Sequence, residues 1–167
     1  MKALLIALSL FVSTATFAGD RMTFFVKQES NASDSLSGVG FSGIISTPRS
    51  HVKGEVITSL NAVTVLDNDG YQQEFLGLDL GLRVGYFNDV FVYIEGGFDA
   101  FESSFKDYDR VNDYYSEDTV DGYASVGGGF QAGPLRIEGY VKARQINADT
   151  WQSDKALFYG IQTSIAF

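Results

Sequence analysis

Large apolar side chains alternate with glycine or charged side chains along most of this chain. The pattern is clearest in residues 75–87, where every second residue is large and apolar and most residues between them are small or charged. Because successive side chains of a β-strand point to opposite faces, this period of two predicts a strand with one apolar face. The apolar face consists of Leu76, Leu78, Leu80, Leu82, Val84 and Tyr86. No part of the chain that follows the first 18 residues has a convincing helical period of 3.6, so a helical bundle is excluded.

The same alternation recurs eight times. The predicted strands are residues 22–29, 36–45, 54–66, 75–87, 90–101, 122–131, 135–144 and 157–167. The composition agrees with an all-β chain, since it has 18 glycines, 9 tyrosines, 14 phenylalanines and only 2 prolines. An even number of hairpin-connected strands lets the sheet close with both ends on one side. We therefore predict an all-β fold, an eight-stranded antiparallel up-and-down transmembrane β-barrel.

The charged side chains in these strands, and Lys53 directly before the third, lie on the face opposite the apolar one. Six basic and six acidic residues share it: Lys27, Glu29, Lys53, Glu55, Asp79, Arg83, Glu95, Asp99, Arg136, Glu138, Lys142 and Arg144. A soluble, lipocalin-like barrel also alternates, but it has its apolar face inside. An equal number of opposite charges on a glycine-rich face favours a polar interior and a lipid-facing exterior. A charge on the lipid face of such a barrel costs several kcal/mol.

The predicted connections form two sets. The short ones are residues 47–52, 88–89 and 132–134; the others, mostly longer and acidic, are residues 30–35, 67–71, 103–119 and 147–156. Short turns on one side and longer loops on the other are typical of outer-membrane barrels. The loop 103–119 combines tyrosines with acids, which suits solvation or surface recognition, and Asp107, Asp109 and Asp113 do not have EF-hand spacing.

The N-terminal segment predicts export. A positive Lys2 precedes the apolar residues 3–12, and Thr16-Phe17-Ala18 forms a small-x-small cleavage site. We expect residues 1–18 to be a signal peptide and residues 19–167 to be the barrel domain. The formal charge of −9 argues against a nucleic-acid partner, and the absence of cysteine excludes disulfides and thiolate sites.

The C-terminal segment resembles the insertion signal of bacterial outer-membrane proteins. Its alternating residues are Tyr159, Ile161, Thr163, Ile165 and Phe167. With the leader, the strands and the loop asymmetry, the whole mature chain resembles the small barrels typified by the OmpA transmembrane domain and OmpX. Residues 121–130 are also reminiscent of YfaZ-type barrels. This resemblance implies the outer membrane of a diderm bacterium, a monomer, contact with outer-membrane lipid and lipopolysaccharide, and assembly by periplasmic chaperones and the barrel-insertion machinery.

The turn at residues 88–89 sets the register of its hairpin. The register that keeps like faces together places Arg83 beside Glu95 and Asp79 beside Asp99. The second pair is like-charged and needs a cation, which Lys27, Lys142 or Arg144 could supply from across the lumen. An eight-stranded barrel is only wide enough for its own side chains. We therefore expect ion pairs to plug the lumen, and the alternative is a narrow or gated pore for ions or small solutes.

Catalysis has little support in the residues. Two eight-stranded enzyme classes of similar size, a palmitoyltransferase and a lipid A deacylase, use a site with histidine. The single histidine here, His51, falls in a predicted short turn, and no serine–carboxylate arrangement surrounds it. The adjacent Asp79 and Asp99 leave carboxylate chemistry conceivable. We expect a non-enzymatic protein without cofactor or metal, with a structural role or a surface-interaction role through its acidic loops.

Overall fold

A computed structural model describes residues 22–45, 50–66, 72–100, 122–144 and 157–167. The predicted leader and the loops 67–71, 103–119 and 147–156 lie outside the described residues, as do residues 47–49 of the turn 47–52. Eight strands form one closed antiparallel barrel in chain order, which confirms the predicted fold class. They are β1 (Met22–Ser30), β2 (Ser35–Ile45), β3 (Val52–Leu66), β4 (Gln72–Tyr86), β5 (Val90–Asp99), β6 (Gly122–Ala132), β7 (Leu135–Arg144) and β8 (Leu157–Ala166).

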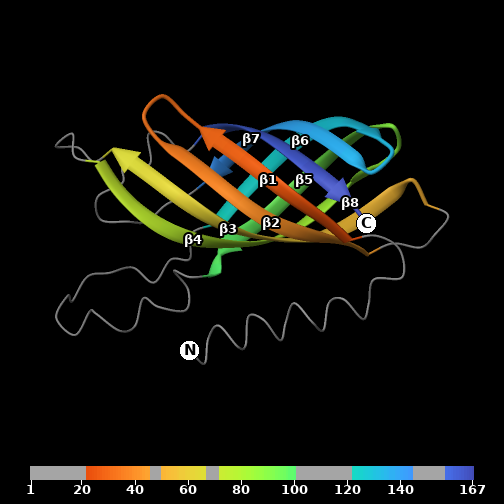
Figure 1. Cartoon of the computed structure of the whole chain (residues 1–167), viewed down its shortest axis with the longest axis horizontal. Coiled ribbons are helices and arrows are strands. Elements are labelled where there is room, and N and C mark those ends of the chain that lie inside the picture. Colours follow the sequence, from red (N-terminus) through yellow and green to blue (C-terminus); the bar gives the residue numbers. More distant parts are fainter. Residues whose placement is uncertain (1–21, 46–49, 67–71, 101–121, 145–156) are drawn as a thin grey trace.

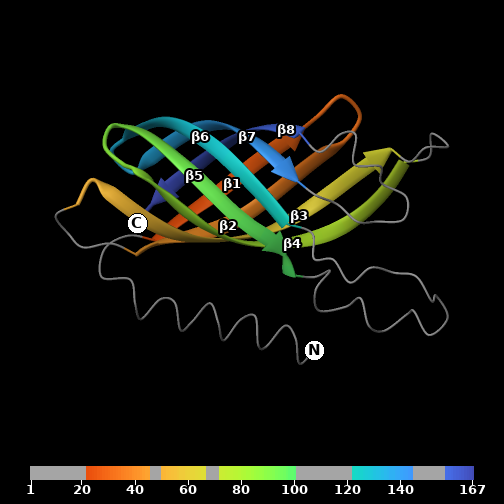
Figure 2. The same ribbon diagram turned by 180° about the vertical axis from the view of Figure 1, so that it is seen from behind.

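The two ends of the barrel differ (Figure 1). At one end, here called the turn end, lie the β4–β5 and β6–β7 turns and the C-terminal Phe167. The ring closes there through β1 and β8, since the backbone N–H groups of Met22 and Phe167 each donate to the other's carbonyl oxygen, at 3.2 and 2.9 Å. The opposite end, the loop end, carries the β1–β2 turn, and β3 and β4 reach furthest in that direction in both views (Figure 2).

Local sequence accounts for the β6–β7 turn. Ala132 pairs with Leu135, which leaves Gly133 and Pro134 as a two-residue loop. Gly133 has a φ of +60°, and a glycine at the first central position is what a type II′ hairpin requires. The 88–89 turn also sets the register as predicted, because Arg83 pairs with Glu95 and Asp79 with Asp99.

Several predicted strand boundaries were wrong. β3 begins at Val52 instead of residue 54, and β4 begins at Gln72 instead of residue 75. The two strands pair with each other along their whole length, from the pair of Val52 with Tyr86 to the pair of Leu66 with Gln72. Cross-strand hydrogen bonds therefore extend both strands beyond the segments in which the alternation is clear. β5 ends at Asp99, before the predicted residue 101.

The interior of the barrel is mainly polar. Eleven of the twelve predicted interior charges, all except Lys53, are less than a tenth exposed and line the lumen, whereas the apolar residues of the opposite faces are exposed on the outside. Near the loop end an apolar cluster also occupies the interior; it consists of Leu36, Val63, Val65 and Phe158. Among the described residues, no helix has the length and apolarity needed to cross a bilayer.

Candidate functional site

Arg83 lies at the centre of the charge network in the lumen. Its Nε and Nη2 donate to Glu95 Oε2 on the neighbouring strand β5, at 3.0 and 2.9 Å. On the other neighbouring strand, β3, Glu55 Oε2 accepts from Nη1 at 3.4 Å. Glu138 comes from β7 across the lumen, with its Oε1 at 2.9 Å from Nη2 and its Oε2 at 3.2 Å from Nη1. One guanidinium therefore joins three strands other than its own.

An aromatic ladder supports this arginine and Arg136. The rings of Phe87, Phe91 and Tyr93 follow one another with centroids 5.6 and 6.3 Å apart. The guanidinium carbon of Arg83 lies 3.8 Å from the centre of the Tyr93 ring, and that of Arg136 lies 5.1 Å from the centre of the Phe91 ring. The face of an aromatic ring attracts a cation that lies over it. These two contacts hold both guanidinium groups where the glutamates reach them.

Asp79 obtains its counter-charges from across the lumen. Arg144 Nη1 and Nη2 donate to its two carboxylate oxygens at 3.0 and 2.6 Å, and Lys27 Nζ donates to Oδ2 at 3.1 Å. Two of the three predicted cations thus approach the like-charged pair. Its partner Asp99 is buried and accepts a hydrogen bond from the backbone N–H of Leu78 at 3.2 Å.

The third predicted cation has a different partner. Lys142 Nζ lies 2.7 Å from Glu29 Oε1. The same oxygen is 3.2 Å from Lys27 Nζ, so Lys27 bridges Glu29 and Asp79. Tyr140 also donates its hydroxyl to this oxygen, at 3.0 Å. Five charged residues from β1, β4 and β7 therefore form a second group of ion pairs, nearer the loop end than the Arg83 group.

Lys53 stands apart from both groups. It is half-buried near the turn end, and no carboxylate in the described part of the chain lies within ion-pair distance of it. Glu55, two residues further along β3, instead accepts from Arg136 Nη1 at 2.9 Å. Instead of the one predicted network, the lumen thus contains two groups of ion pairs and a separate lysine that faces the mouth of the barrel.

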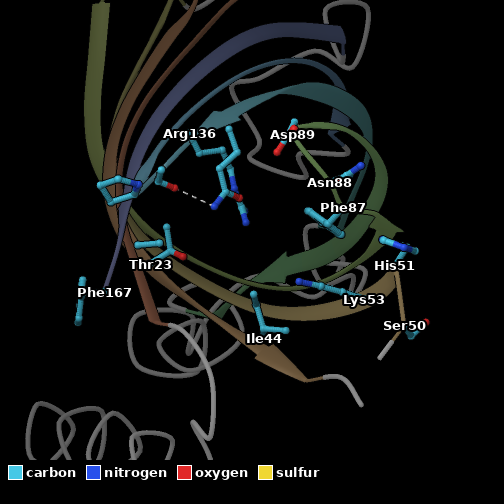
Figure 3. A pocket seen from close by; sticks show the side chains of 14 residues that line it. Thr23, Ile44, Ser50, His51, Lys53, Phe87, Asn88, Asp89, Arg136 and Phe167 are labelled. Atoms are coloured by element: carbon cyan, nitrogen blue, oxygen red, sulfur yellow. Dashed lines mark hydrogen bonds between the residues drawn. The ribbon is translucent and has the colours of Figure 1, made fainter. Parts of the chain in front are cut away.

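That mouth is a cavity of about 640 Å³ at the turn end. Figure 3 shows the side chains of Thr23, Lys53, Phe87 and Arg136 around it, directed from the wall toward its middle. The Thr23 hydroxyl is buried and has no hydrogen-bond partner among the described residues. Sequence reasoning missed this threonine, although its position on the inward-facing side of β1 was a signal.

His51 also lies at the mouth, where it is exposed. Its ring lies 5.4 Å from that of Tyr86 on the outer face of β4. In the part of the chain that the structure describes, no three His, Asp or Glu residues gather as a metal site.

The residues of the predicted insertion signal lie on the outer face of β8. Tyr159, Ile161, Thr163 and Ile165 alternate outward with buried residues between them, and Phe167 follows with 70% of its surface exposed. The outward apolar surface continues around the barrel and includes Leu82, Val92, Ile94 and Val126, each at least 58% exposed.

The comparisons with known proteins assign no family. No protein-family model and no curated protein matches the chain. A solved structure from work described as "De novo design of transmembrane beta-barrels" is similar, with 16% sequence identity and a TM-score of 0.48, over 88% of this chain and 93% of that chain. This likeness assigns no role to any residue.

Proposed function

We propose that the protein is an integral barrel of a bacterial outer membrane, of the kind that the OmpA transmembrane domain and OmpX typify. The observation that carries this proposal is the inverted distribution of polarity. Arg83, Glu55 and Glu138 are at most 2% exposed inside, while Leu82 and Ile94 are 62% and 66% exposed outside. Water would favour the reverse arrangement, and a hydrocarbon surround favours this one.

The height of the apolar surface supports the same proposal. Along β4 the outward side chains are apolar or aromatic from Leu76 to Tyr86. These ten steps, at about 3.3 Å each and a strand tilt of about 40°, give a height of about 25 Å, which matches the apolar band of membrane barrels. The exposed Glu74 ends the band at the loop end, and on β1 the exposed Gln28, hydrogen-bonded to Ser37, does the same.

Exposed aromatic residues border this band. Tyr86, Phe130 and Phe167 lie outward near the turn end, and Phe98 and Tyr159 lie outward toward the loop end. Membrane barrels carry such girdles where lipid head groups meet the hydrocarbon. Under this proposal the turn end faces the periplasm and the loop end faces the outside.

We further propose that the barrel does not conduct ions and has no enzymatic activity. The three-strand clasp of Arg83 and the ion pairs of Asp79 span the interior, and the cluster of Leu36, Val63, Val65 and Phe158 lies between them and the loop end. Its role is then to stabilise the envelope or to present the acidic loops to a partner. Lipid and lipopolysaccharide surround a monomer.

Planar-bilayer recording tests this proposal. Refolded protein is first floated with lipid vesicles, and protection of the strands from added protease confirms insertion. We expect insertion without discrete conductance steps. Conductance steps from inserted protein would establish the narrow pore instead, and failure to float would refute the membrane assignment.

A further inference from the structure

We propose that the mouth of the barrel at the turn end binds a small organic monoanion. A carboxylate of this ligand would be held by Lys53 and Arg136, and its apolar part would lie against Phe87. The site goes beyond the proposed envelope role, which requires no ligand. The site opens at the turn end, and Arg136, which forms an ion pair with Glu55, lies in its lining.

The charges at the mouth favour an anion. Within the described ranges, Lys53 has no carboxylate partner, and Arg136 donates a hydrogen bond through Nη1 alone, to Glu55. Asp89 is the acidic residue of the lining, and it is exposed on the β4–β5 turn. Among the side chains that line the cavity in the described ranges, Lys53 and Arg136 are basic and Asp89 is acidic. The remaining guanidinium N–H groups of Arg136 are suited to bind a carboxylate in the two-pronged manner of arginine.

The unpartnered hydroxyl of Thr23 independently indicates a polar ligand. This side chain is only 1% exposed and lines the cavity, yet its oxygen has no hydrogen-bond partner among the described residues. A buried hydroxyl without a partner is costly, and most such groups in proteins are satisfied. A carboxylate oxygen at the mouth would accept its hydrogen.

The apolar part of the lining favours an organic anion over inorganic phosphate. Phe87 is 6% exposed at the wall, and Ile44 and Pro134 also line the cavity. A volume of about 640 Å³ lies within the usual range for small-molecule sites. A ligand with a carboxylate and a ring or short chain satisfies both parts of this lining, whereas phosphate leaves the apolar part without contact.

The first experiment compares charged and neutral probes of the same shape. The protein, refolded in an uncharged detergent, is titrated with benzoate, with benzamide and with inorganic phosphate while backbone amide resonances are recorded. We expect benzoate to shift the amides of Thr23, Lys53 and Arg136 saturably and the other two probes to leave them unchanged. Equal shifts with benzamide would overturn the proposal, and stronger binding of phosphate would overturn the organic monoanion.

Variants then test the residues that hold the carboxylate. Lys53→Gln should weaken benzoate binding at least about fivefold, because a charged hydrogen bond is lost, and Lys53→Arg should stay within about twofold. Thr23→Val should weaken it less. Glu74→Gln, at the far end of β4, is the matched control and should bind as the natural chain does. Unchanged binding by a folded Lys53→Gln variant would refute the site.

Discussion

Arg83 and Glu95 face each other across the β4–β5 ladder, and two nitrogens of the arginine donate to one oxygen of the glutamate, at 3.0 and 2.9 Å. The pair is not isolated. Glu55 and Glu138 contact the same guanidinium, so the arginine is shared, while the ion-pair partner of Glu95 among the described residues is Arg83. The two side chains therefore differ in what their removal leaves behind.

Replacing Arg83 should destabilise the barrel more than replacing Glu95. Arg83→Met leaves buried carboxylates without their counter-charge, which costs roughly 3–5 kcal/mol. Glu95→Gln leaves the arginine two glutamates and should cost about 1–3 kcal/mol. Urea unfolding of protein in lipid vesicles measures both.

The double variant tests the coupling between these two residues. Arg83→Met with Glu95→Gln should cost less than the sum of the single changes, because the second change removes one of the charges that the first leaves without a partner. If the two costs add within about 0.5 kcal/mol, the pair does not interact energetically.

A charge on the outer face should cost free energy according to its depth. Leu82→Arg places a guanidinium near the middle of the apolar band, where the expected cost is about 2–4 kcal/mol. Tyr86→Arg, on the same strand at the turn-end border, should cost about 1 kcal/mol or less beyond the lost ring contacts. The free energies of unfolding of the two variants in lipid vesicles compare the two depths. Equal costs would contradict a hydrocarbon surround.

Interior glycines make room for tyrosines on adjacent strands. Gly160 pairs with Tyr140, and a Cβ added at Gly160 would meet the tyrosine ring, whereas a Cβ at Gly43 would meet nothing within 4 Å. Gly160→Ala should therefore destabilise the barrel by about 1–3 kcal/mol through overpacking. Gly43→Ala is the matched control and should be neutral or slightly stabilising. Thermal unfolding in detergent distinguishes them.

The terminal aromatic side chain should matter for assembly more than for stability. Phe167→Ala keeps both backbone hydrogen bonds to Met22 and removes a ring that is 70% exposed. We expect a lower outer-membrane level in bacterial cells and nearly unchanged refolding in detergent. Val90→Ala, equally exposed at the same end, controls for loss of apolar surface. An outer-membrane level equal to that of the natural chain would refute the insertion-signal role.

Short-range pattern was enough to predict the strands and their faces. The period of two in residues 75–87 fixes which side chains share a face, and the tight turn at 88–89 fixes the pairing of Arg83 with Glu95, because a shift by one residue would move charges to the apolar face. Where polar residues replace the alternation, as at Gln72–Glu74, the strand ends were misplaced, since only pairing with β3 extends β4 there.

Contacts across the lumen depended on the closed barrel. The sequence put Lys27, Lys142 and Arg144 at similar heights, but it did not distinguish which of them reaches Asp79; in the folded chain Lys27 and Arg144 do, and Lys142 binds Glu29. Likewise only closure brings Glu138 to Arg83, and Thr23, Lys53 and Arg136 to one mouth. The physical reason is that alternation and turns act between neighbouring residues and strands, whereas the stagger and curvature of all eight strands together set the distances across the interior.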